Sequence, residues 1–254
     1  MINKFSSTTK SMDALDGVLL LNKPVGFTSN DAVQRVKHLF CAKKVGHTGT
    51  LDPLASGLML ICFGRCTKLF DTLVSSQKGY WARVILGEKR TTGDGEGEIE
   101  AVSSREPTFS EVEDAVYSFL GAIEQIPPAY SAIRIGGVRM YSLARRGVTV
   151  PRQRRTCTIT GIALLGYSYP AIDIRVYCSK GTYIRTLAEN IGASLGCCSY
   201  LGQLIRTMVG RYHVNDATHI RDIQELPLVQ RRELLLLPSY RHPIGRTVLY
   251  PQST

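Results

Sequence analysis

The sequence lacks the long apolar runs of a membrane protein. Its longest apolar stretches, at 17–21 and 57–63, are far shorter than the roughly 18–20 residues that a bilayer crossing needs. The N-terminal stretch 1–16 mixes Ser, Thr, Lys and Asp without an apolar segment and therefore shows no secretory signal. These absences predict a protein that stays in the cytoplasm and does not enter a membrane.

Several common catalytic and metal-binding motifs are also missing. There is no C-x-x-C pair, no H-E-x-x-H motif, no Walker loop and no G-x-S-x-G turn. The seven cysteines are an odd number without the spacing of a zinc site, so we expect small core side chains in a reducing compartment. The sequence thus predicts no metal site, and it gives no support to ATP hydrolysis or serine esterase activity.

Positive charge is present in excess and is unevenly placed. The 254 residues contain 31 Lys and Arg against 21 Asp and Glu, a formal charge of +10. Nine acidic residues stand against three basic ones at 88–114, whereas 125–172 has seven arginines, no lysine and no acidic residue. Arginines interleaved with tyrosines suit phosphate binding and base stacking. We predict a nucleic-acid-binding protein, and a basic surface that only keeps the chain soluble is the alternative.

Apolar periodicity predicts an alternation of strands and helices without internal repeats. Strands are expected at 17–22, 58–63, 80–86 and 172–178. Three helices are expected: one capped by Ser29 or Asn30, one opened by a capping box from Ser110 to Glu113, and one over 184–195. The stretch 44–56 should be a loop and 93–97 an exposed turn. This order predicts an α+β fold with a mixed or antiparallel central sheet flanked by helices.

The loop at 44–56 contains one carboxylate and one imidazole among small residues. Its glycines allow close approach of the backbone to a ligand, and Pro53 biases Asp52 toward an extended conformation. A carboxylate held in this way can act as a nucleophile or as a base. From the residues alone, an ordinary Asp-Pro turn remains the simpler interpretation.

The run GHTGTLDPLASG at 46–57 resembles the signature of the TruB family, the bacterial tRNA pseudouridine synthases that act on uridine 55 in the T loop. Four further blocks are similar to that family in the same order. They are LLLNKPVGFTSND at 19–31, QKGYWARVILG at 77–87, IEQIPPAYSAIRIGGVRMYSLARRGVTVPR at 123–152 and CSKGTYIRTLAENIGASLGC at 178–197. Several long blocks in order are far more specific than one short motif.

The resemblance implies an isomerase of the pseudouridine synthase fold that needs no cofactor. Asp52 falls on the family's catalytic aspartate, and Arg185 falls on the arginine that pairs with it and should keep its pKa low. The first chemical step stays open among addition to uracil C6, attack at C1′ and proton removal from C2′. All three steps need an ionised carboxylate. On helical periodicity alone, Arg185 would be an ordinary exposed residue.

A uridine inside a folded T loop must be flipped out, at an unstacking cost on the order of a few kcal/mol. The resemblance implies that Tyr80 lies on the flipped uracil and serves in its later proton transfer. The other substrate-binding positions that it implies are His47, Tyr183 and Leu204, together with Lys23 and Lys180 as phosphate contacts or active-site support. Without the family, these residues would be interpreted as core, loop or solvated surface.

The arginine-rich segment coincides with a long mobile insertion of the family at about 125–156, which is similar to a clamp that closes over RNA. The arginines expected on the RNA backbone are Arg134, Arg139, Arg145, Arg146 and Arg152. Because they would bind phosphates of the T arm, their removal should weaken binding and flatten its salt dependence.

The resemblance also implies a domain organisation. We expect an N-terminal tail at 1–15, a catalytic domain at 16–213 and a short C-terminal segment at 214–254, with most of the family's C-terminal RNA-binding lobe absent. Two positions depart from the family pattern: Arg90-Thr91-Thr92 replaces Thr-Asp-Thr, and Ile205-Arg206 replaces a pair of arginines. The expected partner is tRNA, and we expect a monomer without an obligatory protein partner.

Two other functions remain as alternatives. One is a tRNA-binding folding chaperone that unfolds and releases the T arm without chemistry, although binding alone does not need a paired carboxylate. The other is an RNA-guided rRNA modifier of the related dyskerin-like branch. The wording TLDPLASG favours the stand-alone bacterial type.

Overall fold

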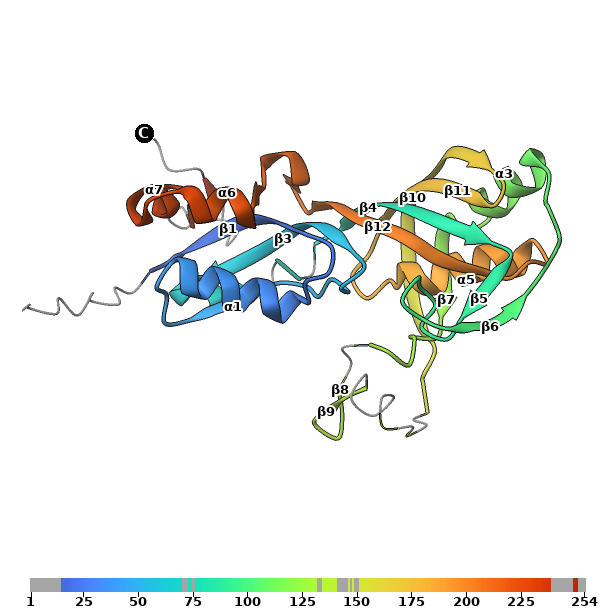
Figure 1. Cartoon of the computed structure of the whole chain (residues 1–254), viewed down its shortest axis with the longest axis horizontal. Helices are drawn as coiled ribbons and strands as arrows, with labels where there is room; N and C mark the ends of the chain where they lie inside the picture. Colours follow the sequence, from blue (N-terminus) through green and yellow to red (C-terminus); the bar gives the residue numbers. More distant parts are fainter. Residues whose placement is uncertain are drawn as a thin grey trace, which may run out of the picture.

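A mixed β-sheet runs through the whole computed structural model (Figure 1). The structure describes residues 15–69, 73–74, 76–131, 134–140, 146, 148, 151–238 and 249–250, of which 134–135, 138–139, 238 and 249–250 are described by their backbone alone. In the described residues the sheet has twelve strands, nine of them in the order β16-β15-β1-β3-β12-β4-β11-β10-β7. These nine are β1 (Gly17–Lys23), β3 (Ser56–Phe63), β4 (Lys78–Leu86), β7 (Gly121–Gln125), β10 (Arg155–Ser168), β11 (Ala171–Cys178), β12 (Ser199–Val209), β15 (Leu235–Pro238) and β16 (Leu249–Tyr250).

Shorter elements complete the fold. The strands β2 (Val45–His47), β13 (Tyr212–His213) and β14 (Thr218–His219) pair with the large sheet, while β5 (Glu88–Arg90) with β6 (Ile99–Val102) and β8 (Arg134–Ile135) with β9 (Val138–Arg139) form separate pairs. The helices are α1 (Ser29–Leu39), α3 (Phe109–Tyr117), α5 (Ile184–Ser194), α6 (Ile220–Glu225) and α7 (Leu228–Glu233), with 3-10 turns η1 (Gly64–Leu69) and η2 (Val214–Asp216). None of the helices in the described residues is long and apolar enough to span a membrane.

The core is divided between the two halves of the sheet. In one half, β1 and β3 pack one face against α1 and α6 and the other against η1. In the other half, β4, β10, β11 and β12 pack against α3 and α5. Figure 1 shows β12 running from one half into the other, so residues in the middle of this strand lie where the two halves meet.

The predicted α+β fold with a mixed sheet is confirmed. All four predicted strands are present as β1, β3, β4 and β11, each within two residues of the expected bounds. Most neighbouring strands are antiparallel, and β12 with β3 and β1 with β14 are parallel pairs. Alternation predicted β11, which buries one face, and short apolar runs predicted β1 and β3, which bury both faces.

Two helix starts differ from the prediction. The N-cap of α1 is Thr28, whose hydroxyl accepts the Asp31 N–H, and not Ser29 or Asn30. The capping box of α3 is Thr108 with Glu111, one of two overlapping matches to the same pattern, and not Ser110 with Glu113. The helices themselves were predicted, but the four-residue capping pattern recurs within one turn and does not by itself select a register.

Two predicted loops are more ordered than expected. Within 44–56, β2 pairs with β3. The stretch 93–97 is not an exposed turn throughout, because Gly95 donates its N–H to the Leu201 carbonyl and the side chain of Asp94 is buried. Pairing with β12 therefore draws an acidic residue into the interior.

All seven cysteines are free thiols. Five are buried, in line with the expected core role, and Cys198 is half-buried. Cys41 is exposed, with a left-handed φ of 50°, and is not the core side chain that was predicted.

Candidate active site

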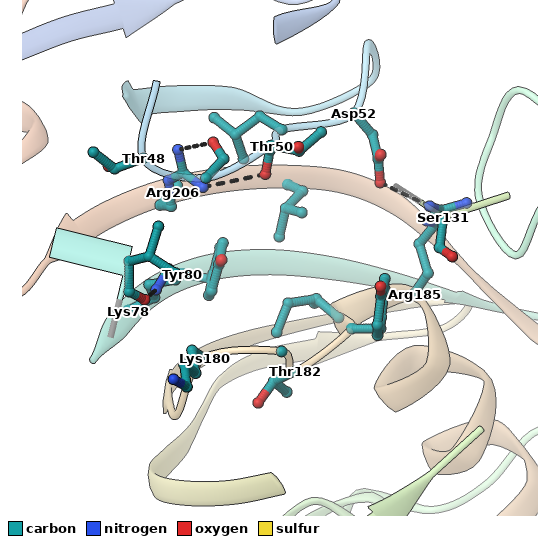
Figure 2. Close-up of a pocket in the computed structure, with 17 residues that line it drawn as sticks. Thr48, Thr50, Asp52, Lys78, Tyr80, Ser131, Lys180, Thr182, Arg185 and Arg206 are labelled. Atoms are coloured by element: carbon teal, nitrogen blue, oxygen red, sulfur yellow. Dashed lines mark hydrogen bonds and ion pairs between the residues drawn. The ribbon is translucent and has the colours of Figure 1, made fainter. Parts of the chain in front are cut away.

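A cavity of about 280 Å³ opens where the Asp52 loop, β4, β12 and the turn before α5 meet (Figure 2). Six of the predicted site residues line it: Asp52, Tyr80, Lys180, Tyr183, Arg185 and Leu204. The sequence analysis did not single out Thr48, Lys78, Ser131, Thr182 and Arg206, which line it as well. The walls come from segments that are far apart in the chain, so tertiary structure creates the cavity.

The loop that carries Asp52 is held by backbone contacts to the start of α1. The Ser29 hydroxyl accepts the N–H of Leu51 at 2.7 Å and donates to its carbonyl at 2.9 Å. The Gly26 N–H donates to the Pro53 carbonyl at 2.8 Å. Because Thr28 caps the helix, the Ser29 side chain is available to hold this loop. Asp52 thus projects from a backbone that is fixed on both sides.

Asp52 forms an ion pair with Arg185, and its Oδ2 lies 3.0 Å from Nη2 of the arginine (Figure 2). The Arg185 side chain is only 6% exposed, so the exposed position expected from helical periodicity is wrong. Its guanidinium also donates to the carbonyls of Thr92 at 2.9 Å and Tyr130 at 2.7 Å. These acceptors satisfy a buried cation and fix its orientation toward Asp52.

Asp94 is a second carboxylate at the same arginine, and the sequence analysis missed it. Its Oδ2 lies 3.5 Å from Nη1 of Arg185, and its side chain is 3% exposed. The Thr92 hydroxyl and the Glu96 N–H donate to its Oδ1. A single acidic residue inside a glycine-rich acidic segment resembles an ordinary turn, so no local signal distinguished Asp94 from its neighbours. Arg185 therefore bridges a buried carboxylate and the cavity carboxylate.

The pKa of Asp52 is raised above the ordinary 3.8 of an aspartate. Burial is the largest cause, and the nearby Asp94 also raises it, while Arg185 and Lys23 lower it. The low pKa predicted from the arginine partner is therefore wrong. Taking a carboxylate out of water penalises its charged form, and here one arginine shared between two carboxylates does not offset that cost.

We expect this raised pKa to appear in the pH dependence of the chemical step. If the ionised form of Asp52 reacts, the rate should fall as pH decreases through the raised pKa, with the inflection above 3.8. Single-turnover rates with enzyme in excess, measured from about pH 8 downward, would locate it without a contribution from tRNA binding. A rate that stays constant down to pH 3.8 would contradict the role of Asp52 as the reactive carboxylate.

Tyr80, Leu204 and Tyr183 form apolar walls around the cavity. Tyr80 and Leu204 are each 7% exposed and belong to the neighbouring strands β4 and β12. Burial raises the pKa of Tyr80 to about 12, although Arg206 beside it lowers the pKa. The side-chain amide of Gln125 holds the backbone of Tyr183, since it accepts the N–H at 2.9 Å and donates to the carbonyl at 3.1 Å.

The two other predicted residues of the loop region lie outside the cavity lining. His47 is half-buried, and its Nδ1 accepts the Gly49 N–H at 3.3 Å. Lys23 is fully buried, and its Nζ donates to the carbonyls of Pro24 and Phe27. Burial lowers the pKa of Lys23 to about 8, while Asp52 raises it. Because the ammonium is buried and its charge interacts with Asp52, this position favours support of the active site over a phosphate contact, the two roles expected for Lys23.

Lys180 is exposed and lines the cavity, as predicted. Lys78, which was not predicted, donates from Nζ to the carbonyls of Val74 and Ser76, both at 2.8 Å. Burial lowers the pKa of Lys78 to about 8. A lysine next to a strand start is a common surface residue, so its burial could not be predicted from the sequence.

The insertion leaves the sheet and returns to it at one point, because Gln125 in β7 pairs with Arg155 in β10. Arg152 is exposed, and Nη1 donates to the Pro127 carbonyl at 3.3 Å. Arg146 is also exposed. Arg134 and Arg139 pair with each other through the backbone of β8 and β9, and Arg145 lies outside the described residues. Arg146 and Arg152, the two whose side chains the structure describes, do not line the cavity.

Among the residues that the structure describes, no three His, Cys, Asp or Glu side chains are grouped as metal ligands.

The chain is similar to proteins of one known family. The family model described as "TruB family pseudouridylate synthase (N terminal domain)" matches residues 37–184. The tRNA pseudouridine synthase B of Burkholderia mallei is 48% identical over 227 residues, which cover 89% of this chain and 74% of that protein. The protein of the same name from Methylobacillus flagellatus is 46% identical over 222 residues, which cover 87% of this chain and 74% of its own length.

Solved structures show the same fold. A chain of a Cbf5-Nop10-Gar1 complex superposes with a TM-score of 0.65 at 27% identity, over 81% of this chain and 53% of that chain. A chain of an archaeal box H/ACA sRNP Nop10-Cbf5 complex superposes with a TM-score of 0.63 at 24% identity, over 84% and 54%. This chain therefore spans about half the length of these solved chains. With more than half of its residues matched by the family model and relatives that are nearly half identical, the chain belongs to the TruB family of pseudouridylate synthases.

Proposed function

We propose that this protein isomerises uridine 55 in the T loop of tRNA to pseudouridine, with Asp52 as the catalytic residue. The observation that carries the proposal is the carboxylate of Asp52 at the wall of a nucleoside-sized cavity, 3.0 Å from the buried Arg185. The curated relatives named tRNA pseudouridine synthase B support tRNA as the substrate. In the reaction the N1–C1′ bond breaks and a C5–C1′ bond forms, while C5 loses a proton and N1 gains one, so no cofactor is consumed.

The residues around Asp52 fit a flipped uridine. Tyr80 offers an aromatic face, and Leu204 and Tyr183 offer apolar surface, against which an extruded base can stack and so offset its unstacking cost. Arg185 keeps the Asp52 carboxylate oriented toward the cavity. Lys180 is proposed to contact the RNA at the edge of the cavity. Lys23, which is buried, is proposed to stabilise the negative charge of Asp52 electrostatically.

The insertion is proposed as the RNA clamp. Its described arginines Arg146 and Arg152 are exposed, as phosphate-binding side chains must be, and it begins and ends beside the cavity at the β7–β10 pair. Tyr130, near its start, accepts a hydrogen bond from Arg185. We extend the same assignment to Arg134, Arg139 and Arg145 from the sequence.

The proposal keeps the predicted organisation: a catalytic domain at 16–213 between a tail at 1–15 and a segment at 214–254. The proposal also keeps the predicted monomer without an obligatory protein partner. The seven free thiols support the reducing environment of the cytoplasm.

Release of tritium from tRNA labelled at uracil C5 tests this function. We expect the wild-type protein to release about one label per tRNA, and none when uridine 55 is replaced by cytidine, because only the C5 of the target uracil exchanges its C–H bond for a C–C bond. Tight binding of tRNA without any release of tritium would refute the isomerase and would favour the folding chaperone.

A further inference from the structure

Arg206 is a fully buried cation in the middle of β12, and its residue is 2% exposed. An arginine has five N–H donors in a planar fork, and burial of this fork is costly unless acceptors satisfy it. The acceptors of Arg206 belong to other elements of the fold. The side chain therefore links β12 to these elements.

The first partner of the guanidinium is the loop that leads to Asp52. Nη1 donates to the Thr50 carbonyl at 3.3 Å and Nη2 to the Gly49 carbonyl at 3.2 Å (Figure 2). Nε donates to the Leu58 carbonyl at 2.6 Å, in the strand that follows this loop. One side chain therefore holds the backbone on both sides of Asp52.

Close approach of the two strands makes this arrangement possible. Arg206 pairs with Gly57 in the parallel β12–β3 ladder. Gly57 has a φ of 102°, and a Cβ atom there would overlap the Arg206 backbone. A Cβ at Gly49 would lie 3.5 Å from Nη1, so the guanidinium also packs directly on that glycine. Arg206 is thus in contact with the backbone at both ends of the Asp52 loop.

The second partner is Tyr80. The antiparallel register places Arg206 directly opposite Tyr80 on β4, so both side chains lie on the same face of the sheet. The guanidinium lies near enough to the Tyr80 hydroxyl to lower its pKa, against the larger effect of burial. The same fork therefore connects the loop of Asp52 with the aromatic wall of the cavity.

We propose that Arg206 is a positioning residue that holds the Asp52 loop in register with Tyr80. The inference rests on the proposed function, in which Asp52 acts on a nucleoside that stacks on Tyr80. A shift of about 1 Å between a reactive group and its substrate costs about 100-fold in rate. Arg206 acts through Asp52 and Tyr80, because its donors are directed to the protein.

The test is Arg206→Lys, with Arg83→Lys as the matched control. Lysine keeps the charge but offers a single ammonium, which cannot hold the three carbonyls of Gly49, Thr50 and Leu58 together. Arg83 lies on β4 and pairs with Asp173 at 2.7 Å, away from the residues that line the cavity. We expect kcat of Arg206→Lys to fall about 100-fold with KM within about 3-fold of wild type. Equal kcat values for the two variants would overturn the proposal.

A double-mutant cycle with Tyr80→Phe separates positioning from a general loss of structure. Phenylalanine removes the hydroxyl that faces the guanidinium, so Arg206→Lys should cost less than about 10-fold in kcat in the Tyr80→Phe background. The same loss in both backgrounds would overturn the link between the loop and Tyr80.

If Arg206→Lys does not fold, Gly49→Val provides a second route, because its methyl groups would displace Nη1 while leaving the arginine in place. We expect the same loss of kcat and the same dependence on Tyr80. Tritium release by the wild type distinguishes a failure of the proposed function from a failure of the role of Arg206. An inactive wild type refutes the proposed function, whereas an active wild type with an unaffected Arg206→Lys and Gly49→Val refutes only the role of Arg206.

Discussion

Replacing Asp52 with asparagine is expected to reduce tritium release by at least about 1000-fold, because the amide can neither attack the nucleoside nor remove a proton from it. The substitution is nearly isosteric, and the surrounding loop is held through backbone contacts to Ser29 and Gly26, so the cavity should keep its shape. Single-turnover assays with labelled tRNA measure the effect directly.

Binding of tRNA by Asp52→Asn should remain within about 3-fold of wild type, since contacts to phosphates dominate affinity for nucleic acids. Asp173→Asn is the matched control, because this aspartate pairs with Arg83 at 2.7 Å and does not line the cavity. It should leave the rate unchanged. Near wild-type turnover by Asp52→Asn would show that another group carries the chemistry.

Arg185→Lys is expected to lower the rate of the chemical step by about 100-fold or more while tRNA affinity stays within about 3-fold. Arg185 contacts Asp52, Asp94 and the carbonyls of Thr92 and Tyr130 with one planar fork. A lysine ammonium donates hydrogen bonds from one nitrogen atom and cannot contact all four of these partners at once. The orientation of Asp52, rather than the net charge of the site, should therefore be lost.

Thermal melting and tRNA binding of Arg185→Lys would show whether the variant keeps its fold. Arg175→Lys is a suitable control, since Arg175 is an exposed arginine on β11. A loss of activity explained entirely by weaker tRNA binding would mean that Arg185 binds RNA and does not orient the Asp52 carboxylate.

Parts of the fold with a local signal were predicted well. Alternation placed β11 and short apolar runs placed β1, β3 and β4, because each strand buries one or both faces. Helix starts were predicted less well, since capping pairs overlap in sequence and only the folded backbone selects Thr28 and Thr108. Asp52 and Arg185 were identified through ordered motif blocks, which their separate local patterns would not have revealed.

The amino-acid sequence was enough to predict the α+β class, the loop that carries Asp52 and membership of the family, and it shows an arginine-rich segment at 125–172. Tertiary structure alone decided that Arg185 bridges Asp52 and Asp94, that Lys23 is buried behind Asp52, and that Arg206 joins the loop to Tyr80. Periodicity reports which face of an element is apolar, but it does not report which distant polar groups meet. Those contacts depend on strand register and on the burial of charges, and burial is also what raised the pKa of Asp52 against the expectation from its arginine partner.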